Sequence, residues 1–140
     1  MAVINKNLKV DATMDNLDRV IGFVEAELEL IECPMKTIMQ ITVSLEEVYV
    51  NVVNYAYDGE IGECEINLNI STDDGNILTL EIKDKGKYFN PLDKEDPDIT
   101  LSADERGIGG LGIFMVKKSM DEVCYKNISG YNILTIVKKW

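Results

Sequence analysis

The chain has 140 residues, the length of one ordinary domain built around a single hydrophobic core. Its 25 acidic and 14 basic residues give a formal net charge of -11, which opposes binding to the phosphate backbone of nucleic acid. Histidine is absent, which excludes Ser-His-Asp hydrolysis, His-ligated zinc and a phospho-accepting histidine within this sequence. We therefore expect a single domain, residues 1–140, that does not bind nucleic acid directly.

The cysteines and the hydropathy indicate where the protein works. Cys33, Cys64 and Cys124 form neither a CxxC pair nor a disulfide framework, so we expect reduced thiols. No apolar run approaches the roughly 20 residues needed to cross a bilayer, and no basic start precedes an apolar stretch. The expected location is the cytoplasm, without contact to a membrane.

The first half of the chain predicts one strand and two helices. Residues 3–10 alternate between apolar and polar, as in a strand, and Asp11 with Thr13 then offers side chains that suit a helix N-terminus. From Leu17 apolar residues recur every three or four positions until Pro34 interrupts them. A second stripe of the same spacing covers residues 38–55, so a second amphipathic helix is expected there.

The second half predicts two hairpins separated by a long loop. Residues 63–70 and 77–82 alternate around the turn-forming residues 73–76, and residues 85–106 show little periodicity. A short helix follows the glycines, and residues 123–126 and 133–137 suit a closing hairpin. This order predicts an α+β fold, a two-layer sandwich with helices packed on one face of a mixed, mostly antiparallel sheet.

Three motifs have side chains suited to ligand chemistry, and the first lies on the second predicted helix. Glu47 and Asn51 are four residues apart, so they share one helix face one turn apart. An Asn oxygen suits Mg²⁺, and a neighbouring Glu can polarise an attacking hydroxyl. The alternative for this pair alone is a solvated polar face.

The second motif, Asp84-Lys85-Gly86, directly follows a predicted strand. An aspartate there can accept a hydrogen bond from a ligand amine, although Asp-x-Gly is also common in ordinary turns.

The third motif is a run of glycines between Arg106 and Gly112. Glycines before a helix allow backbone amides and the helix dipole to face an anion, which favours phosphate binding. Residues 107–112 satisfy GxGxxG, but a polar loop stands where a dinucleotide-binding fold requires a strand. A Walker A loop is excluded because no Gly-Lys-Ser or Gly-Lys-Thr occurs.

Taken in order, these motifs resemble the conserved boxes of a known ATPase fold. The set consists of Glu47-x-x-x-Asn51, Asp84-x-Gly86, Gly109-Gly110-Leu111-Gly112 and Thr135. It resembles the boxes shared by gyrase, Hsp90, histidine kinases and MutL. Within that superfamily, residues 47–57, 84–91 and 109–123 are similar to the anti-sigma factor serine/threonine kinases, and the resemblance spans essentially the whole chain.

The resemblance implies a Bergerat-type ATP-binding fold with ATP and Mg²⁺ as cofactors. Asn51 would hold Mg²⁺ on the ATP phosphates, and Glu47 would act as the base toward the acceptor hydroxyl. Asp84 would bind the adenine amine, with Gly86 and Thr135 close to the base. The loop around the phosphates would consist of Gly109, Gly110, Leu111 and Gly112, and residues 85–108 would form a lid.

The resemblance also implies partners. These are a sigma factor held inactive, a small anti-anti-sigma protein of the STAS type that is phosphorylated on serine or threonine, and a second copy of the chain in a homodimer. Two positions differ from many members of the family. Tyr55 stands where a histidine is frequent, and Ile108 replaces an arginine.

Two other hypotheses remain open at this point. The chain could be a non-catalytic module that uses ATP only to regulate its affinity for a partner. It could also be the detached catalytic domain of a histidine kinase, in which case the phospho-accepting histidine has to lie on another protein.

Overall fold

The computed structural model describes residues 3–93 and 111–140. The elements follow the predicted order, with two additional single-turn 3-10 helices at Met14–Asn16 and Pro91–Asp93. The helices and strands are β1 (Val3–Asp11), α1 (Leu17–Leu30), α2 (Met35–Tyr55), β2 (Glu63–Ser71), β3 (Ile77–Asp84), α3 (Leu111–Ser119), β4 (Glu122–Ile128) and β5 (Tyr131–Lys139).

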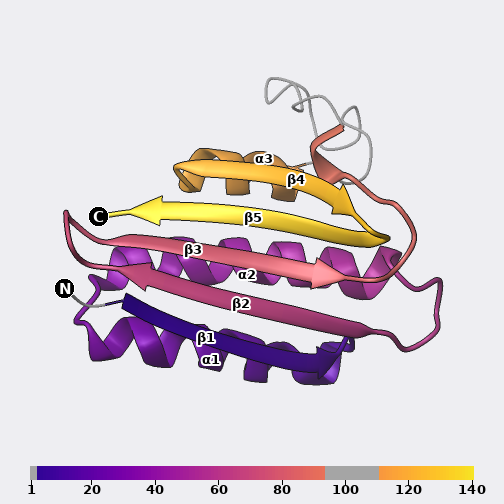
Figure 1. Cartoon of the computed structure of the whole chain (residues 1–140), viewed down its shortest axis with the longest axis horizontal. Coiled ribbons are helices and arrows are strands. Elements are labelled where there is room, and N and C mark those ends of the chain that lie inside the picture. The colour runs from indigo at the N-terminus through magenta and orange to yellow at the C-terminus, as the bar shows by residue number, and fades with distance from the viewer. Residues whose placement is uncertain (1–2, 94–110) are drawn as a thin grey trace.

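The five strands form one sheet in the order β1-β2-β3-β5-β4, with all three helices behind it (Figure 1). Helix α1 contacts β1, α2 contacts the central strand β3, and α3 contacts β4. The two-layer α+β prediction is confirmed. The sheet is more regular than expected, because every pairing among the described strands is antiparallel.

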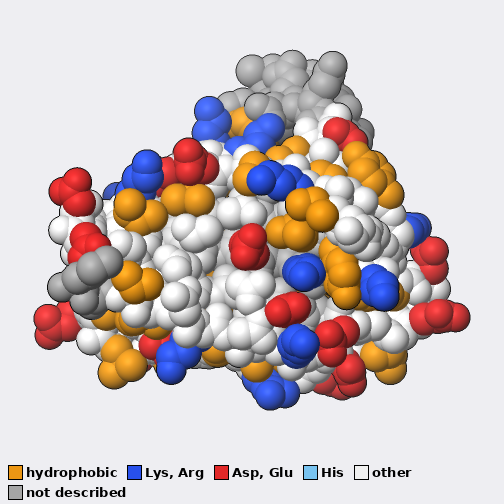
Figure 2. All heavy atoms as spheres, viewed as in Figure 1, with side chains coloured by type: hydrophobic (Ala, Val, Ile, Leu, Met, Phe, Trp, Pro, Cys, Tyr) orange, Lys and Arg blue, Asp and Glu red, His pale blue; other side chains and the backbone are white. Residues whose placement is uncertain are grey.

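Strand alternation separates the two faces of the sheet. On β2 and β3 every second side chain is buried against the helices, and the residues between them face away. Buried side chains on the central strands include Ile66, Leu68, Leu80 and Ile82. The face that the helices leave open has charged and apolar side chains interspersed among polar ones (Figure 2).

Helix α2 forms the other half of this core. Its buried residues Ile41, Leu45, Val48 and Val52 repeat every three or four positions and so form one stripe toward the sheet. The helix begins directly after Pro34, whose extended backbone suits a helix start. Among the described residues, no helix is long and apolar enough to span a membrane.

The cysteines are free thiols, as expected, with Cys33 and Cys64 buried and Cys124 exposed. Burial between α2 and the sheet, with Asp84 nearby, raises the pKa of Cys64 to about 12. Because the thiolate is the reactive form, Cys64 contributes to packing rather than to chemistry.

Tyr49 links α2 to the segment that connects β1 and α1. Its side chain is fully buried, and its hydroxyl donates to the carbonyl oxygen of Thr13 at 2.7 Å. The backbone N–H of Thr13 donates back to the same hydroxyl at 3.1 Å. One side chain thereby fixes how the first connection packs on the central helix.

Replacing Tyr49 with phenylalanine should therefore lower the free energy of unfolding by about 1 kcal/mol, because the hydrogen bonds between its hydroxyl and the partly buried backbone of Thr13 are lost. Chemical denaturation measures this difference. Tyr88→Phe is the matched control, since Tyr88 is 63% exposed, and it should change stability by less than about 0.5 kcal/mol. Equal effects of the two substitutions would contradict the structural role of the Tyr49 hydroxyl.

Candidate functional site

A pocket lies between α2 and the sheet, where β3 ends and β5 begins. It brings together Asn51 from the helix and Asp84 from the strand, two residues that the sequence predicted for one site. Among the described residues, the lining consists of Val48, Asn51, Val52, Ala56, Ile82, Asp84, Phe89, Pro91, Tyr125, Asn132 and Leu134. Most of these side chains are apolar, and Asp84 is the only acidic residue among them.

The carboxylate of Asp84 is the dominant polar feature of this pocket. Asp84 is 6% exposed, and its Oδ1 accepts hydrogen bonds from the Gly86 N–H and from Asn132 Nδ2, both at 2.9 Å. No donor among the described residues reaches Oδ2. Burial raises the pKa of Asp84, and the hydrogen bonds from Asn132 and Gly86 oppose that increase. The carboxylate therefore keeps one oxygen available to a ligand donor.

Gly86 is required by the path of the chain rather than by a turn conformation. A Cβ atom at Gly86 would lie 2.2 Å from the carbonyl oxygen of Ala56, at the end of α2. The neighbouring Lys87 N–H donates to that same carbonyl at 2.9 Å. Only glycine allows the segment that leaves β3 to approach α2 this closely, and that approach closes one side of the pocket.

Asn132 lies in the pocket although the sequence analysis did not select it. It pairs with Asp84 across β5 and β3 and is 5% exposed. The signal was present in the sequence, because Asn132 is in phase with Leu134 and Ile136, which face the helices. A polar residue on the buried face of a strand, opposite a buried aspartate, was the feature to look for.

Thr135, the residue that the sequence selected on this strand, lies outside the pocket. Side chains alternate along β5, so Thr135 is directed to the open face while Leu134 and Ile136 are buried. Its neighbours across the sheet are Glu81 and Cys124. The structure thus separates Thr135 from Asp84 and places Asn132 beside that carboxylate instead.

Glu47 lies one helical turn before Asn51 and lines a different hollow. This second hollow lies between α2 and α3, and its lining consists of Val43, Ser44, Glu46, Glu47, Gly112, Met115, Val116 and Ser119. A Cβ atom at Gly112 would lie 2.1 Å from Glu47 Oε1. The missing side chain of Gly112 therefore lets the first turn of α3 lie directly against the Glu47 carboxylate.

The remaining predicted residues are only partly described. Leu111 is the first residue of α3, whereas Gly109 and Gly110 lie outside the described residues. The expected lid, residues 85–108, is described only as far as residue 93. Within that part, the Phe89 ring lines the pocket and packs on Tyr55, with 5.2 Å between the ring centroids.

The described residues form no complete metal-binding site. No cluster of three or more cysteine, aspartate or glutamate side chains in residues 3–93 and 111–140 could bind an ion alone. Asn51 can supply one amide oxygen to the pocket. A single protein oxygen is consistent with Mg²⁺ held largely by phosphate oxygens and water.

The raised pKa of Asp84 has a measurable consequence for stability. The folded protein disfavours the charged carboxylate, so replacement by asparagine should raise the unfolding temperature at pH 7. As the pH falls from 7 toward 4, folded Asp84 takes up its proton before the unfolded chain does. The wild type then gains stability relative to Asp84→Asn, so the difference in unfolding temperature between the two proteins should become smaller.

Thermal unfolding of both proteins across this pH range tests that expectation. Asp74→Asn is the control, because it removes an equal charge from an exposed turn. If the difference in unfolding temperature between wild type and Asp84→Asn widens on acidification, the pKa of Asp84 is not raised in the folded protein, which would contradict the assigned direction.

Comparisons with known proteins agree with this architecture. A family model described as the histidine kinase-like ATPase domain matches residues 10–138. The serine-protein kinase RsbW of Oceanobacillus iheyensis is 30% identical in an alignment 115 residues long, which covers 75% of this chain and 66% of that protein. The anti-sigma F factor of a Thermoanaerobacter species is 26% identical over 106 residues, covering 76% of this chain and 72% of that protein.

A solved structure shows the same fold. The RsbU and RsbW domains of a Mycobacterium tuberculosis protein superpose with a TM-score of 0.66 at 17% identity, covering 96% of this chain and 32% of that one. The family match spans nearly the whole chain and includes every residue that lines the pocket. The chain belongs to the histidine kinase-like ATPase family.

Proposed function

We propose that the chain is an ATP-dependent serine/threonine protein kinase that sequesters a sigma factor and phosphorylates an anti-anti-sigma factor. The observation that carries this proposal is the buried Asp84 carboxylate, whose Oδ2 accepts no hydrogen bond from the described residues, in a mostly apolar pocket that also contains Asn51. The names of two relatives, a serine-protein kinase and an anti-sigma F factor, support the same activity and the same class of partner.

The pocket suits an adenine base. Val48, Ile82 and Leu134 provide apolar surface for a flat ring, and Asp84 Oδ2 can accept a hydrogen bond from the 6-amino group. A guanine would place its carbonyl oxygen against that carboxylate and leave two acceptors facing each other. Gly86 contributes by letting the segment with Phe89 and Pro91 close on the ring from the other side.

Asn51 and Glu47 would have separate roles in the transfer of phosphate. When bound, Mg²⁺ neutralises charge on the transferred phosphoryl group, and Asn51 would hold it there. Four residues along a helix correspond to a rise of about 6 Å, which separates an ion on the phosphates from an incoming hydroxyl. Glu47 would take the proton from that hydroxyl as it attacks.

The phosphates themselves would lie along the glycine-rich segment. We assign Gly109, Gly110, Leu111 and Gly112 to this loop, because in the sequence they precede and begin α3, and Gly112 lies against Glu47. Residues 85–108 would cover the nucleotide as a lid. Thr135 has no place in this arrangement, since Asn132 occupies the position beside Asp84.

The proposed partners indicate where in the cell the protein acts. A sigma factor acts in the cytoplasm, so we place the chain there, as a homodimer that binds the sigma factor and an anti-anti-sigma protein of the STAS type. The alternative is a module that binds ATP and changes its affinity for a partner without transferring phosphate. The two functions differ in what they require of Glu47.

Glu47→Gln should reduce transfer of labelled γ-phosphate to the anti-anti-sigma protein by about 100-fold or more, because general-base catalysis contributes about 10² to 10⁴ in rate. ATP affinity should change by less than about threefold, since Glu47 does not line the purine pocket. Glu29→Gln is the matched control, because Glu29 is an exposed residue of α1 that lines neither the pocket nor the hollow, and it should retain transfer.

A wild-type protein that binds ATP and its partners but never labels the anti-anti-sigma protein would favour the non-catalytic module. Equal loss of activity in the Glu29 and Glu47 variants would contradict the role assigned to Glu47.

A further inference from the structure

We infer that Asn132 is the positioning residue that makes this pocket selective for a 6-aminopurine, because its side chain orients Asp84. The inference rests on the proposed ATP binding and extends it to a residue that none of the predicted motifs includes. Asn132 does not need to touch the base. It acts by fixing which oxygen of Asp84 is presented to the ligand and by holding one wall of the pocket in place.

Every hydrogen-bonding group of the Asn132 amide has a partner. Nδ2 donates to Asp84 Oδ1 at 2.9 Å and to the carbonyl oxygen of Lys87 at 2.8 Å. Oδ1 accepts from the Tyr125 hydroxyl and from Asn127 Nδ2, the latter at 3.1 Å. With the longer contact from the Phe89 N–H, five hydrogen bonds from β3, β4 and the segment after β3 meet on one buried amide.

These partners permit only one orientation of the amide. The Lys87 carbonyl can only accept a hydrogen bond, so the group that faces it must be the NH₂. On the other side, the Phe89 backbone N–H can only donate, and it faces Oδ1 at 3.5 Å. A rotation that exchanged nitrogen and oxygen would set two acceptors against each other at Lys87 and two donors at Phe89. The donor toward Asp84 is thus fixed.

The fixed donor determines what Asp84 offers to a ligand. With Gly86 N–H and Asn132 Nδ2 both bound to Oδ1, the carboxylate has a defined rotation and Oδ2 is the oxygen left for the pocket. Without Asn132, only the Gly86 hydrogen bond would remain on the carboxylate. The carboxylate would then sample orientations that do not meet the 6-amino group.

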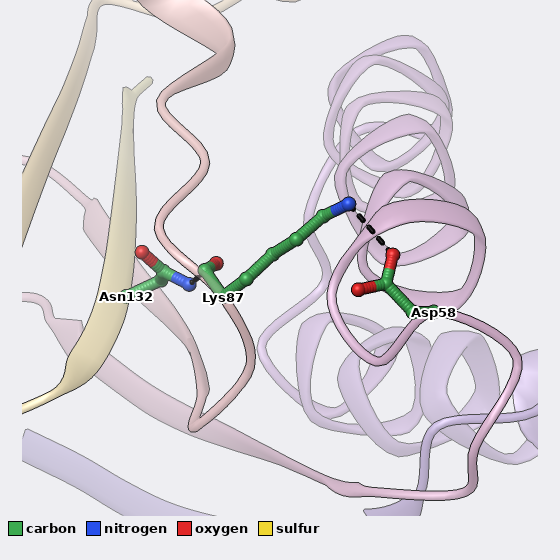
Figure 3. Close-up of polar contacts among 3 residues, drawn as sticks. All are labelled: Asp58, Lys87 and Asn132. Atoms are coloured by element: carbon green, nitrogen blue, oxygen red, sulfur yellow. Dashed lines mark hydrogen bonds and ion pairs between the residues drawn. The ribbon is translucent and has the colours of Figure 1, made fainter.

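Asn132 also anchors the wall opposite α2. Lys87 is held from two sides, because its N–H donates to the Ala56 carbonyl at 2.9 Å and its own carbonyl accepts from Asn132 Nδ2. Figure 3 shows the second of these contacts. The Lys87 ammonium also pairs with Asp58 at 2.6 Å, but both side chains are more than half exposed, so this ion pair contributes little. The two backbone contacts therefore fix the start of the segment that contributes Phe89 and Pro91 to the pocket.

This role predicts a loss of selectivity rather than a general loss of binding. We would measure dissociation constants for ATP and for the triphosphate of purine riboside, which lacks only the 6-amino group. Wild type should prefer ATP by about 10- to 100-fold, as a hydrogen bond to a charged acceptor allows. In Asn132→Leu and Asn132→Ala, which both lack the Nδ2 donor, the preference should fall to about threefold or less.

The matched control is Asn69→Ala, the same chemical change on the open face of the sheet, where Asn69 pairs with Asn5. It should keep the wild-type ratio. Thermal unfolding establishes that each variant is folded, and if the leucine variant is not, the alanine variant decides alone because it adds no bulk to the pocket.

The two possible failures are distinguishable. Variants of Asn132 that weaken both nucleotides equally and keep the wild-type preference would overturn the positioning role while leaving the proposed ATP binding intact. A wild-type protein that binds neither nucleotide, or binds both equally, would overturn the assignment of Asp84 and the inference with it.

Discussion

The hydrogen bonds on the Asp84 carboxylate are the constraint on which the site depends. A carboxylate buried among Val52, Ile82 and Leu134 is costly unless donors satisfy it, and two donors reach one of its oxygens. One comes from the chain immediately after β3 and one from the neighbouring strand β5. The two hydrogen bonds satisfy Oδ1 and leave Oδ2 to a ligand. A buried charge with a purely structural role would have partners on both oxygens.

Meeting this constraint shapes the surrounding backbone. For Gly86 to donate to Asp84, the chain must turn back against the end of α2, and only glycine tolerates the contact with Ala56. For Asn132 to donate, β5 must pair with β3 in a register that sets Asn132 opposite Asp84. The order of strands in the sheet and the close approach of helix and loop therefore serve the same interaction.

One face of helix α2 lines both the pocket beside the sheet and the hollow beside α3. Asn51 lies in the apolar pocket with Asp84, and Glu47, one turn earlier, lies in the hollow beside α3. A phosphoryl transfer needs the donor and the acceptor on opposite sides of the transferred group, in line. In the proposed function the purine pocket holds the donor, and the hollow lined by Glu47 is where an acceptor hydroxyl would approach.

Periodicity predicted most of the fold, because a buried helix stripe and an alternating strand are local patterns. It placed both long helices, both hairpins and the two-layer arrangement, and the motif order led to the correct family. The ends of the strands were harder to predict. The predicted strands stopped at Ile82 and started at Ile133, whereas β3 continues to Asp84 and β5 begins at Tyr131. Asp84 and Asn132 lie in those extensions and pair there.

Candidate site residues can be selected from the sequence where one motif contains the chemistry, and they are overlooked where the chemistry depends on register. Glu47, Asn51 and Asp84 could be selected by residue type and spacing. The sequence marks Asn132 only by its phase with Leu134 and Ile136, and its partner lies 48 positions away in the sequence and adjacent in the sheet. Thr135 matched the motif, but the alternation of β5 directs it to the opposite face. The tight contacts of Gly86 and Gly112 likewise depend on neighbours that only the folded chain brings near.

The most direct test of the account is a calorimetric titration of ATP into the purified protein, with and without Mg²⁺, repeated on Asp84→Asn and Asn51→Ala. The account predicts that wild type binds ATP and that Asp84→Asn weakens binding by about tenfold or more whether or not Mg²⁺ is present. Asn51→Ala should weaken binding only when Mg²⁺ is present. Wild-type protein that binds neither ATP nor ADP, or an Asp84→Asn variant that binds ATP as tightly as wild type, would contradict the central claim that this pocket recognises adenine through Asp84.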